Sequence, residues 1–351
     1  ICGGVKELVV RTERSIAGLV TMARLAKLRM AIGAALLAAV LLSGRSARAE
    51  SIGPLGNAQA LNAPQAVDGT FAVGVSNGNV VGGYYSAANL NHGFLFNGNS
   101  FTPLDFPGST TTMTSGISGQ NIVGFYTDAS NATHGFLYNG QAWTPLDVPN
   151  GNNTVAAGIS GNRIVGYFSD GTKTQGFLYD PANSPNPFLT LNDPTPGAQS
   201  TVAYGIDGSE IVGYFMAGNH VHGFSYIGGA YTTLDFPGSI STAAYGVSGG
   251  DIVGAYQDAS GIYHGFLYNG ADWTALNVAL PGATSTQAYG ISGNQVVGEY
   301  VDTSLVNHGF IAALPVPGPS SIVMLASGAL TAVALMRRRC WPHYRQLPKC
   351  I

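Results

Sequence analysis

A unit of about 42 residues recurs six times between Thr70 and Leu314, which confines this part of the chain to folds built from copies of one module. The unit contains, in order, the patterns Y-G-I-S-G-N-x-I-V-G-x-Y-x-D, H-G-F-L-Y-N-G and W-T-x-L-D-x-P-G. Its first glycine returns at intervals of 42, 42, 47, 41 and 44 residues, at Gly74, Gly116, Gly158, Gly205, Gly246 and Gly290.

Two further glycine columns keep the same phase through all six units. They are Gly82, Gly124, Gly166, Gly213, Gly254 and Gly298, and Gly93, Gly135, Gly176, Gly223, Gly265 and Gly309. A glycine kept at one phase indicates a place where another part of the backbone comes too close for a Cβ. A flexible glycine-rich linker would scatter its glycines instead.

Each unit contains four short runs rich in β-branched and aromatic residues, and each run predicts a strand. In the second unit the runs are Thr112–Ser118, Asn121–Thr127, His134–Asn139 and Ala142–Val148. Two-residue turns such as Gly119-Gln120 join the first run to the second. Asn-Gly pairs join the third run to the fourth and predict type I′ turns with two positive φ angles, at Asn97-Gly98, Asn139-Gly140 and Asn269-Gly270.

Four antiparallel strands in a unit of this length are typical of a propeller blade. The predicted fold class is therefore all-β, a six-bladed β-propeller of four-stranded antiparallel blades. The sixth unit stops after its third strand, at His308–Leu314, whereas Leu61-Asn62-Ala63-Pro64 matches the end of a fourth strand. We expect this N-terminal segment to complete the last blade and close the ring, which removes two exposed sheet edges. An open solenoid is the alternative.

Charge is distributed unevenly along the chain. Between Glu50 and Pro315 there are 16 acidic residues but two basic ones, Arg163 and Lys173, a net charge of −14. A surface this acidic repels phosphate backbones, so we expect no nucleic-acid partner. All three cysteines lie outside the repeats, at Cys2, Cys340 and Cys350, so no disulfide is expected to link the blades.

The N-terminal end has the layout of a targeting segment. Residues 22–49 predict a secretory signal peptide, with the apolar stretch Met30–Leu42 and a small-x-small cleavage site at Ala47 and Ala49 before Glu50. Residues 1–21 precede the expected start and are left unassigned. The repeats then occupy residues 50–314.

The C-terminal end has the layout of a second targeting segment. Pro317-Gly318-Pro319 and Ser320 precede the apolar run Ile322–Met336, which is followed by Arg337-Arg338-Arg339. As a helix the run would span about 22 Å, less than the ~30 Å core of a bilayer. The order resembles the PEP-CTERM sorting signal of Gram-negative bacteria, whose Pro-Glu-Pro core is recognised by an exosortase. By this resemblance residues 315–339 form the sorting or anchor segment, with Pro317, Gly318 and Pro319 as its core and the arginines as its cytoplasmic stop. Gly318 replaces the family's glutamate, and residues 340–351 extend past the usual end; a plain membrane anchor is the alternative.

The repeat itself resembles a known sequence family. Its motif His134-Gly135-Phe136-Leu137, repeated at His264-Gly265-Phe266-Leu267, is similar to the His-x-Phe-Leu hallmark of the HAF-type probable extracellular repeats. The similarity covers about Leu61–Leu314. It implies an extracellular location and no established activity.

Residues whose side chains could act in catalysis or bind a metal ion also recur at fixed positions of the repeat. The histidine column is His92, His134, His222, His264 and His308, with Gln175 in the third unit, and this exchange favours hydrogen bonding over catalysis or metal binding. One aspartate column is Asp128, Asp170, Asp258 and Asp302, and the other is Asp105, Asp147 and Asp235, with Asn62, Asn192 and Asn277 in the remaining units. We expect these side chains to stabilise turns, with a calcium site as the alternative.

The aromatic columns allow two interpretations. Tyr204, Tyr245 and Tyr289 precede the first glycine, while Trp143, Trp273, Phe101 and Tyr231 share a phase in the fourth strand. Their strand alternation favours a place in the blade core, and exposure would make them a sugar-stacking surface. The third unit departs most from the repeat, but its Arg163 and Lys173 are expected on opposite faces of the ring.

We therefore expect a protein secreted to, or held at, the cell surface of a Gram-negative bacterium, anchored in the inner membrane by its C-terminal helix before processing. The expected role is a non-enzymatic structural or interaction platform in the extracellular matrix. A glycan-binding module that takes exopolysaccharide is the alternative, and a propeller lyase or glycosidase comes third, with Glu299 as the non-repeating acid to substitute. The expected partners are an exosortase-type enzyme, polysaccharide and surface proteins. We expect no catalytic residue, metal or cofactor.

Overall fold

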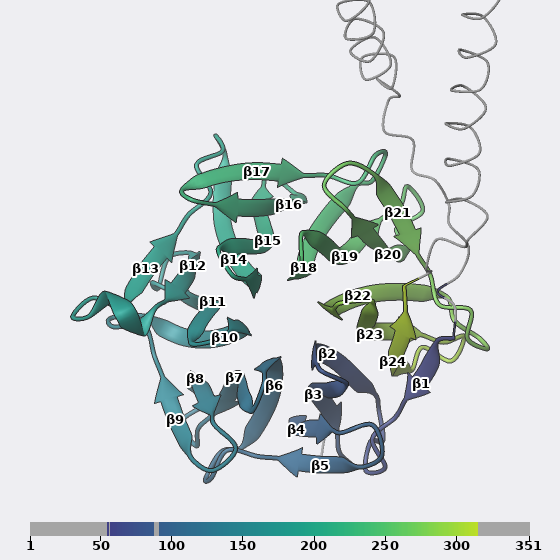
Figure 1. The fold of residues 1–351 in the computed structure, drawn as a ribbon, viewed down its shortest axis with the longest axis horizontal. Coiled ribbons are helices and arrows are strands. Elements are labelled where there is room, and N and C mark those ends of the chain that lie inside the picture. The colour runs from purple at the N-terminus through teal and green to yellow at the C-terminus, as the bar shows by residue number, and fades with distance from the viewer. Residues whose placement is uncertain (1–54, 56, 88–90, 315–351) are drawn as a thin grey trace, which may run out of the picture. The chain divides into compact units, whose positions relative to one another are not determined.

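The repeats form six four-stranded antiparallel sheets arranged around one axis, as Figure 1 shows. The structure is a computed structural model that describes residues 55, 57–87 and 91–314. It confirms the predicted fold class, a six-bladed β-propeller. In blades 1 to 5 the strands pair in chain order from the axis to the rim, because short turns join consecutive antiparallel strands, whereas the outer strand of blade 6 is β1.

The strand bounds follow the repeat. Blade 1 contains β2 (Thr70–Ser76), β3 (Asn79–Tyr85), β4 (Asn91–Phe96) and β5 (Phe101–Leu104), and blade 2 contains β6 (Thr111–Ser118), β7 (Asn121–Thr127), β8 (Thr133–Tyr138) and β9 (Trp143–Leu146). Blade 3 contains β10 (Asn152–Ser160), β11 (Arg163–Ser169), β12 (Thr174–Tyr179) and β13 (Phe188–Leu191), and blade 4 contains β14 (Ala198–Asp207), β15 (Glu210–Ala217), β16 (His220–Ile227) and β17 (Ala230–Leu234). Blade 5 contains β18 (Ser241–Ser248), β19 (Asp251–Gln257), β20 (Tyr263–Tyr268) and β21 (Trp273–Leu276), and blade 6 contains β22 (Ser285–Ser292), β23 (Gln295–Val301), β24 (Asn307–Ala313) and β1 (Gln59–Leu61).

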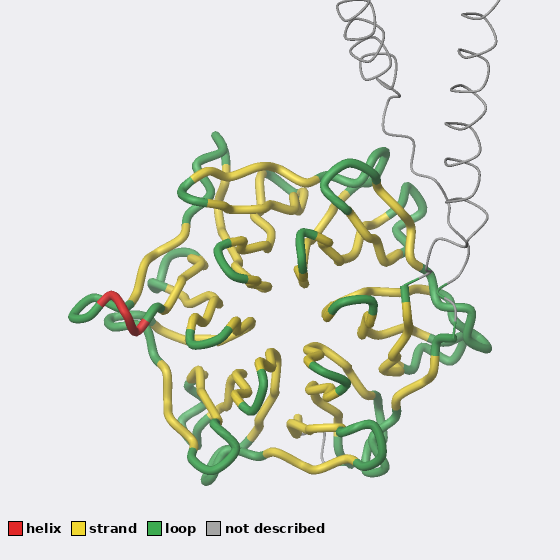
Figure 2. The backbone as a smooth tube through the Cα atoms, in the orientation of Figure 1, coloured by secondary structure: helices red, strands yellow, loops and turns green. Residues whose placement is uncertain are grey.

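The predicted strands of the second unit match β6 to β9 to within one or two residues at each end. The insertion in the third unit carries a short 3-10 turn at Pro181–Asn183, drawn in red in Figure 2. Asp180 caps this turn by accepting a hydrogen bond from the backbone N–H of Ala182 at 3.0 Å. Loops and turns otherwise connect the strands of the described residues.

The ring is closed by the N-terminal segment, as the sequence predicts. Strand β1 pairs antiparallel with β24, and Ala60 lies opposite Phe310. Leu61 lies opposite Gly309 just as Leu104 lies opposite Gly93 in blade 1, so β1 takes the place of a fourth strand. Pairing of segments from both ends of the repeat region removes the two sheet edges that an open ring would expose.

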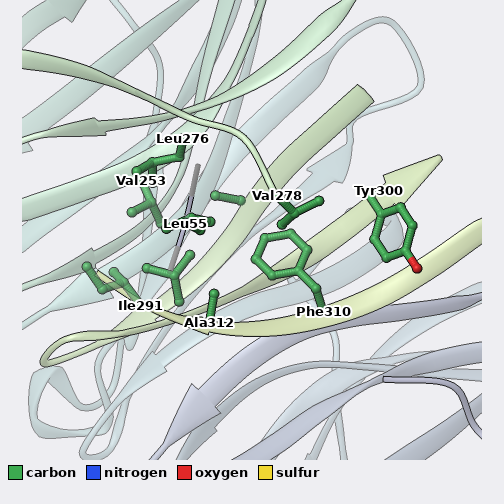
Figure 3. Close-up of a cluster of buried hydrophobic side chains, with 10 residues drawn as sticks. Leu55, Val253, Leu276, Val278, Ile291, Tyr300, Phe310 and Ala312 are labelled. Atoms are coloured by element: carbon green, nitrogen blue, oxygen red, sulfur yellow. The ribbon is translucent and has the colours of Figure 1, made fainter. Parts of the chain in front are cut away.

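Each blade has an apolar core centred on one phenylalanine of its third strand. These six side chains are fully buried: Phe94, Phe136, Phe177, Phe224, Phe266 and Phe310. In blade 6, shown in Figure 3, Phe310 lies in one cluster with Tyr300, Val278 and Leu55. The backbone N–H of Leu55 also donates to Asn277 O at 2.9 Å. The N-terminal segment therefore stabilises the boundary between blades 5 and 6 as well as the last sheet.

A buried threonine at the start of each inner strand ties that strand to the preceding blade. Its Oγ1 accepts a hydrogen bond of 2.9 to 3.3 Å from a backbone N–H of the connecting segment. The six residues are Thr70, Thr112, Thr154, Thr201, Thr242 and Thr286. This threonine column was not predicted, although it keeps a fixed position in all six repeats of the sequence.

The prediction of type I′ turns at the three Asn-Gly pairs is wrong. The glycine has positive φ, for example 93° at Gly98, but Asn97 is absent from the residues with positive φ. The physical reason is that the Asn97 side chain makes a local cap, in which its Oδ1 accepts from the backbone N–H groups of Asn99 and Ser100 at 3.0 and 2.9 Å. Both residues do have positive φ at Asn77-Gly78, between β2 and β3.

Candidate functional site

The six inner strands β2, β6, β10, β14, β18 and β22 meet around the axis at the first glycine column. A Cβ on Gly74 would lie 2.7 Å from Ser115 O in the next blade, and one on Gly290 would lie 2.6 Å from Val73 O. Because real side chains do not approach this closely, glycine is required here, as predicted. A cavity of about 70 Å³ lies on the axis and is lined by all six inner strands, which is room for several water molecules.

One half of this cavity differs from the other. In blades 1 to 3 the residue before the first-column glycine is Val73, Ser115 or Ala157, whereas in blades 4 to 6 it is Tyr204, Tyr245 or Tyr289. The ring centroids of Tyr204 and Tyr245 lie 5.0 Å apart, and those of Tyr245 and Tyr289 also lie 5.0 Å apart. The three half-buried rings therefore form a continuous aromatic wall across three blades, which we call the tyrosine wall.

Tyr214 extends the tyrosine wall, and two further tyrosines lie within electrostatic reach of it. Tyr167 of β11 and Tyr214 of β15 each follow a second-column glycine, and the Tyr214 ring lies 6.3 Å from that of Tyr245. Tyr263, at the start of β20, is 43% exposed, and its phenol contributes to the raised pKa of Tyr245.

A phenol with the ordinary pKa of about 10 is neutral at neutral pH, and burial moves the pKa of four of these tyrosines still higher. Burial raises the pKa of Tyr167 to about 12, with the Tyr214 phenol adding to the effect. Burial also raises the pKa of Tyr204, Tyr245 and Tyr289. At neutral pH these side chains therefore offer O–H groups, oxygen lone pairs and ring faces to a ligand.

A buried carboxyl group lies among these phenols. Glu299 of β23 is 6% exposed, and its Oε1 accepts hydrogen bonds from Gln287 Nε2 and Tyr289 OH, both at 2.8 Å. Its Oε2 is buried and has no hydrogen-bond partner. Burial raises the pKa of Glu299, and the two hydrogen bonds oppose this shift. The charge of Glu299 contributes to the raised pKa of Tyr204, Tyr245 and Tyr289, which places it within electrostatic reach of the wall.

The tyrosines and Glu299 are separate features in the sequence, and the fold brings Glu299 into contact with Tyr289. The break in symmetry was expected in the third unit, where the structure confirms that the two cations do not converge. Arg163 begins β11, where its Nε lies 3.3 Å from Asp180 Oδ2, while Lys173 precedes β12 at the other end of the same strand pair. The sequence does carry a signal for this site. Tyrosine precedes the first-column glycine in three of the six units, and glutamate follows the second-column glycine in one unit, at Glu299.

The histidine column makes internal contacts. The His92 ring stacks on Tyr84 with 5.3 Å between centroids, and its Nδ1 lies 3.0 Å from Asp105 Oδ2. In blade 3 Gln175 bridges equivalent partners, donating to Asp170 and accepting from Asn192. The exchange of histidine and glutamine thus preserves the hydrogen bonds, as the sequence suggested.

His134 is held between two carboxylates. Its Nδ1 lies 3.0 Å from Asp147 Oδ2, and its Nε2 lies 3.5 Å from Asp128 Oδ2. Burial alone would lower the pKa of His134, but the hydrogen bonds and charges of Asp147 and Asp128 outweigh it and raise that pKa. The hydroxyl of Ser130 and the backbone N–H of Ala132 are the main reasons why the pKa of Asp128 is lowered to about 2.

The recurrent aspartates of the second strand stabilise the loops that follow it. Asp302 Oδ1, for example, accepts from the backbone N–H groups of Ser304 and Val306 at 2.8 and 3.0 Å. Within the described ranges no group of three or more His, Cys, Asp or Glu residues is arranged to hold a metal ion.

The fourth-strand aromatics pack inside the blades. Trp143 lies 4.9 Å from the ring of Phe136, and Trp273 lies 5.1 Å from that of Phe266. Tyr231 packs in the same way on Phe224, at 5.3 Å. The two aromatic sets thus have different places, since the fourth-strand set belongs to the blade core and the inner-strand tyrosines line the channel.

The expected targeting residues lie outside the described residues. These are Ala47, Ala49 and Glu50 of the cleavage site, and Pro317, Gly318, Pro319, Ser320, Arg337, Arg338 and Arg339 of the sorting signal. In the part of the chain that the structure describes, no helix has the length and apolar character needed to span a bilayer.

No family model and no curated protein matches the chain. Solved structures with a similar backbone include the SapL1 lectin in complex with alpha methyl fucoside, at 16% identity and a TM-score of 0.46, covering 72% of this chain and 99% of that chain. They also include the six-bladed fungal lectin from Aleuria aurantia, at 14% identity, a TM-score of 0.45 and coverage of 72% and 97%. Trypanosoma rangeli sialidase is similar at 9% identity and a TM-score of 0.47, with coverage of 74% and 60%. At these values the function of the chain has to rest on its own residues.

Proposed function

We propose that this protein is an exported, non-enzymatic propeller that binds a glycan at the tyrosine wall of its axial channel. The observation that carries the proposal is the gathering of four tyrosines in ring contact, one of them hydrogen-bonded to Glu299, at the place where the ring departs from its own repeat. Aromatic faces with a few convergent polar groups are the usual lining of small-ligand sites. Tyrosine suits a sugar because its ring packs on C–H groups while its hydroxyl hydrogen-bonds.

The rest of the molecule supports this choice of site. The histidine column is engaged with Asp or Asn side chains, and the fourth-strand aromatics are packed inside the blades. The tyrosine wall faces a cavity instead of a blade core. Glycan binding, which the sequence allowed as the alternative to a structural platform, is therefore the better-supported role.

A binding role also suits the carboxyl chemistry better than hydrolysis does. Glycosidases generally act through a pair of carboxyl groups flanking the scissile bond. Glu299 is hydrogen-bonded to Gln287 and Tyr289, and no second carboxyl group is among the groups that shift its pKa. Glu299 is therefore assigned an acceptor role for a ligand donor.

The test measures binding of soluble polysaccharides, including the producer's own exopolysaccharide, by calorimetry. Tyr245→Ala and Tyr214→Ala should each weaken binding about 3- to 10-fold, because each removes an aromatic face from the wall. Tyr268→Ala is the matched control, since Tyr268 lies in an outer hairpin where its hydroxyl donates to Gly270 O at 3.0 Å. The proposal would be contradicted if the protein binds no glycan, or if all three variants lose affinity to the same degree. Turnover of a glycan that Glu299→Gln abolishes would favour an enzyme instead.

The motifs at the two ends of the chain are the basis for proposing export and sorting. We propose that cleavage follows Ala49 and that an exosortase-type enzyme processes the chain near Pro317–Pro319. Mass spectrometry of protein recovered from outside the producing cells tests both steps, and an intact chain from Met22 to Ile351 would refute them.

A further inference from the structure

The unpartnered oxygen of Glu299 lies beside the tyrosine wall, because Glu299 is hydrogen-bonded to Tyr289, which lines the cavity. Oε1 already accepts two hydrogen bonds, from Gln287 and Tyr289, while Oε2 accepts none. A buried carboxylate oxygen without a partner is unfavourable by itself. A ligand that donates a hydrogen bond to Oε2 would remove this penalty on binding.

Three features favour a positively charged donor over a hydroxyl group. Glu299 supplies the negative charge, and no Lys, Arg or His is among the groups that shift its pKa. The faces of Tyr204, Tyr245 and Tyr289 attract a cation through their ring electrons. The phenol oxygens can accept the remaining N–H groups of an ammonium, which has three donors and no acceptor.

The charge of the whole ring acts in the same direction. The net charge of −14 between Glu50 and Pro315 attracts a polycation and repels a polyanion. The two basic side chains of this segment, Arg163 and Lys173, both belong to blade 3, and Arg163 is paired with Asp180. An acidic polysaccharide would therefore meet repulsion both at the site and at a distance.

The size of the cavity limits which part of a ligand can enter it. About 70 Å³ accommodates a small group at the level of the glycines, and the tyrosine wall continues from there through Tyr245 to Tyr214. An amino group on a sugar can reach the inner end of the wall while the sugar ring packs against its outer part.

Accepting the proposed glycan-binding function, on which this step rests, we propose that the channel recognises glycans with free amino groups, such as incompletely N-acetylated hexosamine polymers. The ammonium donates to Glu299 Oε2 and lies against Tyr204, Tyr245 and Tyr289. Acetylation of the amine removes the charge and adds bulk, so an acetylated polymer is the weaker ligand.

The decisive experiment compares two forms of one oligosaccharide, β-1,4-linked glucosamine and the same oligomer fully N-acetylated, by calorimetry with the full-length protein. We expect the amine form to bind at least about tenfold tighter. Glu299→Gln should reduce this preference to below about threefold, because the isosteric amide lacks the charge. Asp251→Asn is the matched control, since it removes one unit of charge at the first residue of β19 and should keep the preference.

Each other outcome overturns a different part of the argument. Equal binding of the two oligomers, or a preference for the acetylated one, would refute amine recognition and leave glycan binding intact. Failure to bind either oligomer while another glycan binds would also refute amine recognition, and failure to bind any glycan would refute the proposed function too. If Glu299→Gln keeps the preference for the amine form, that preference comes from the net charge of the ring instead of from this site. The comparison of ligands on the unmodified protein does not depend on whether a variant folds.

Discussion

Closure of the ring predicts that Leu61 stabilises the fold as strongly as its counterparts inside continuous blades. Leu61 is 5% exposed and Leu234, in the same position of blade 4, is 4% exposed. Each lies opposite a third-column glycine, Gly309 or Gly223, and each packs into an apolar cluster. Truncating a buried leucine to alanine lowers the free energy of unfolding by about 2–5 kcal/mol. We therefore expect Leu61→Ala and Leu234→Ala each to cost an amount in this range.

Urea unfolding followed by tryptophan fluorescence measures this cost, because Trp143 and Trp273 lie in blades 2 and 5, outside the closing sheet. The dependence of the unfolding free energy on urea should be the same for both variants, which shows that they lose the same folded unit. A cost below about 0.5 kcal/mol for Leu61→Ala beside more than about 2 kcal/mol for Leu234→Ala would mean that the N-terminal segment is not docked in solution. The closed ring would then be refuted.

Two further predictions concern the columns that hold the blades. Thr242→Val should lower the free energy of unfolding by about 1–3 kcal/mol, because it leaves the buried N–H of Phe236 without its acceptor at 2.9 Å. The control is Thr233→Val, at an exposed position. Equal urea midpoints for the two variants would contradict this prediction. His134 has a pKa raised above 6.5, so its two carboxylate partners stabilise the fold fully below that value and progressively less as the pH rises through the folded-state pKa. His134→Gln should therefore lower the melting temperature more at about pH 5.5 than at about pH 8.5, and a difference independent of pH would refute the pairing.

Much of the architecture could be predicted because it depends on contacts within a unit and between neighbouring units. The glycine phases mark where inner strands meet, as at Gly74 and Ser115, and the same contact recurs around the ring. The segment at Leu61 could be predicted as a fourth strand because Leu61 precedes Gly74 by 13 residues, much as Leu104 precedes Gly116 by 12. The failure at Asn97-Gly98 came from side-chain capping, which competes with the backbone geometry that the dipeptide suggests.

The candidate site could not be predicted in the same way. Tyr167 and Glu299 are 132 positions apart in the chain, and only the closed ring brings their blades to a common axis. Sequence alternation also could not separate the Tyr245 ring, which lines the channel, from the Trp273 ring, which fills a blade. Both columns alternate like core residues, because each faces away from bulk solvent.

The sequence by itself determined the number of blades, the order of their strands and the segment that closes the ring, since a repeated local pattern forces repeated local pairing. The tertiary structure decided which polar and aromatic side chains are satisfied inside the fold and which remain available to a ligand. That distinction depends on what lies opposite each side chain across the axis, and only the arrangement of the inner strands around that axis supplies the answer for Glu299 and the tyrosine wall.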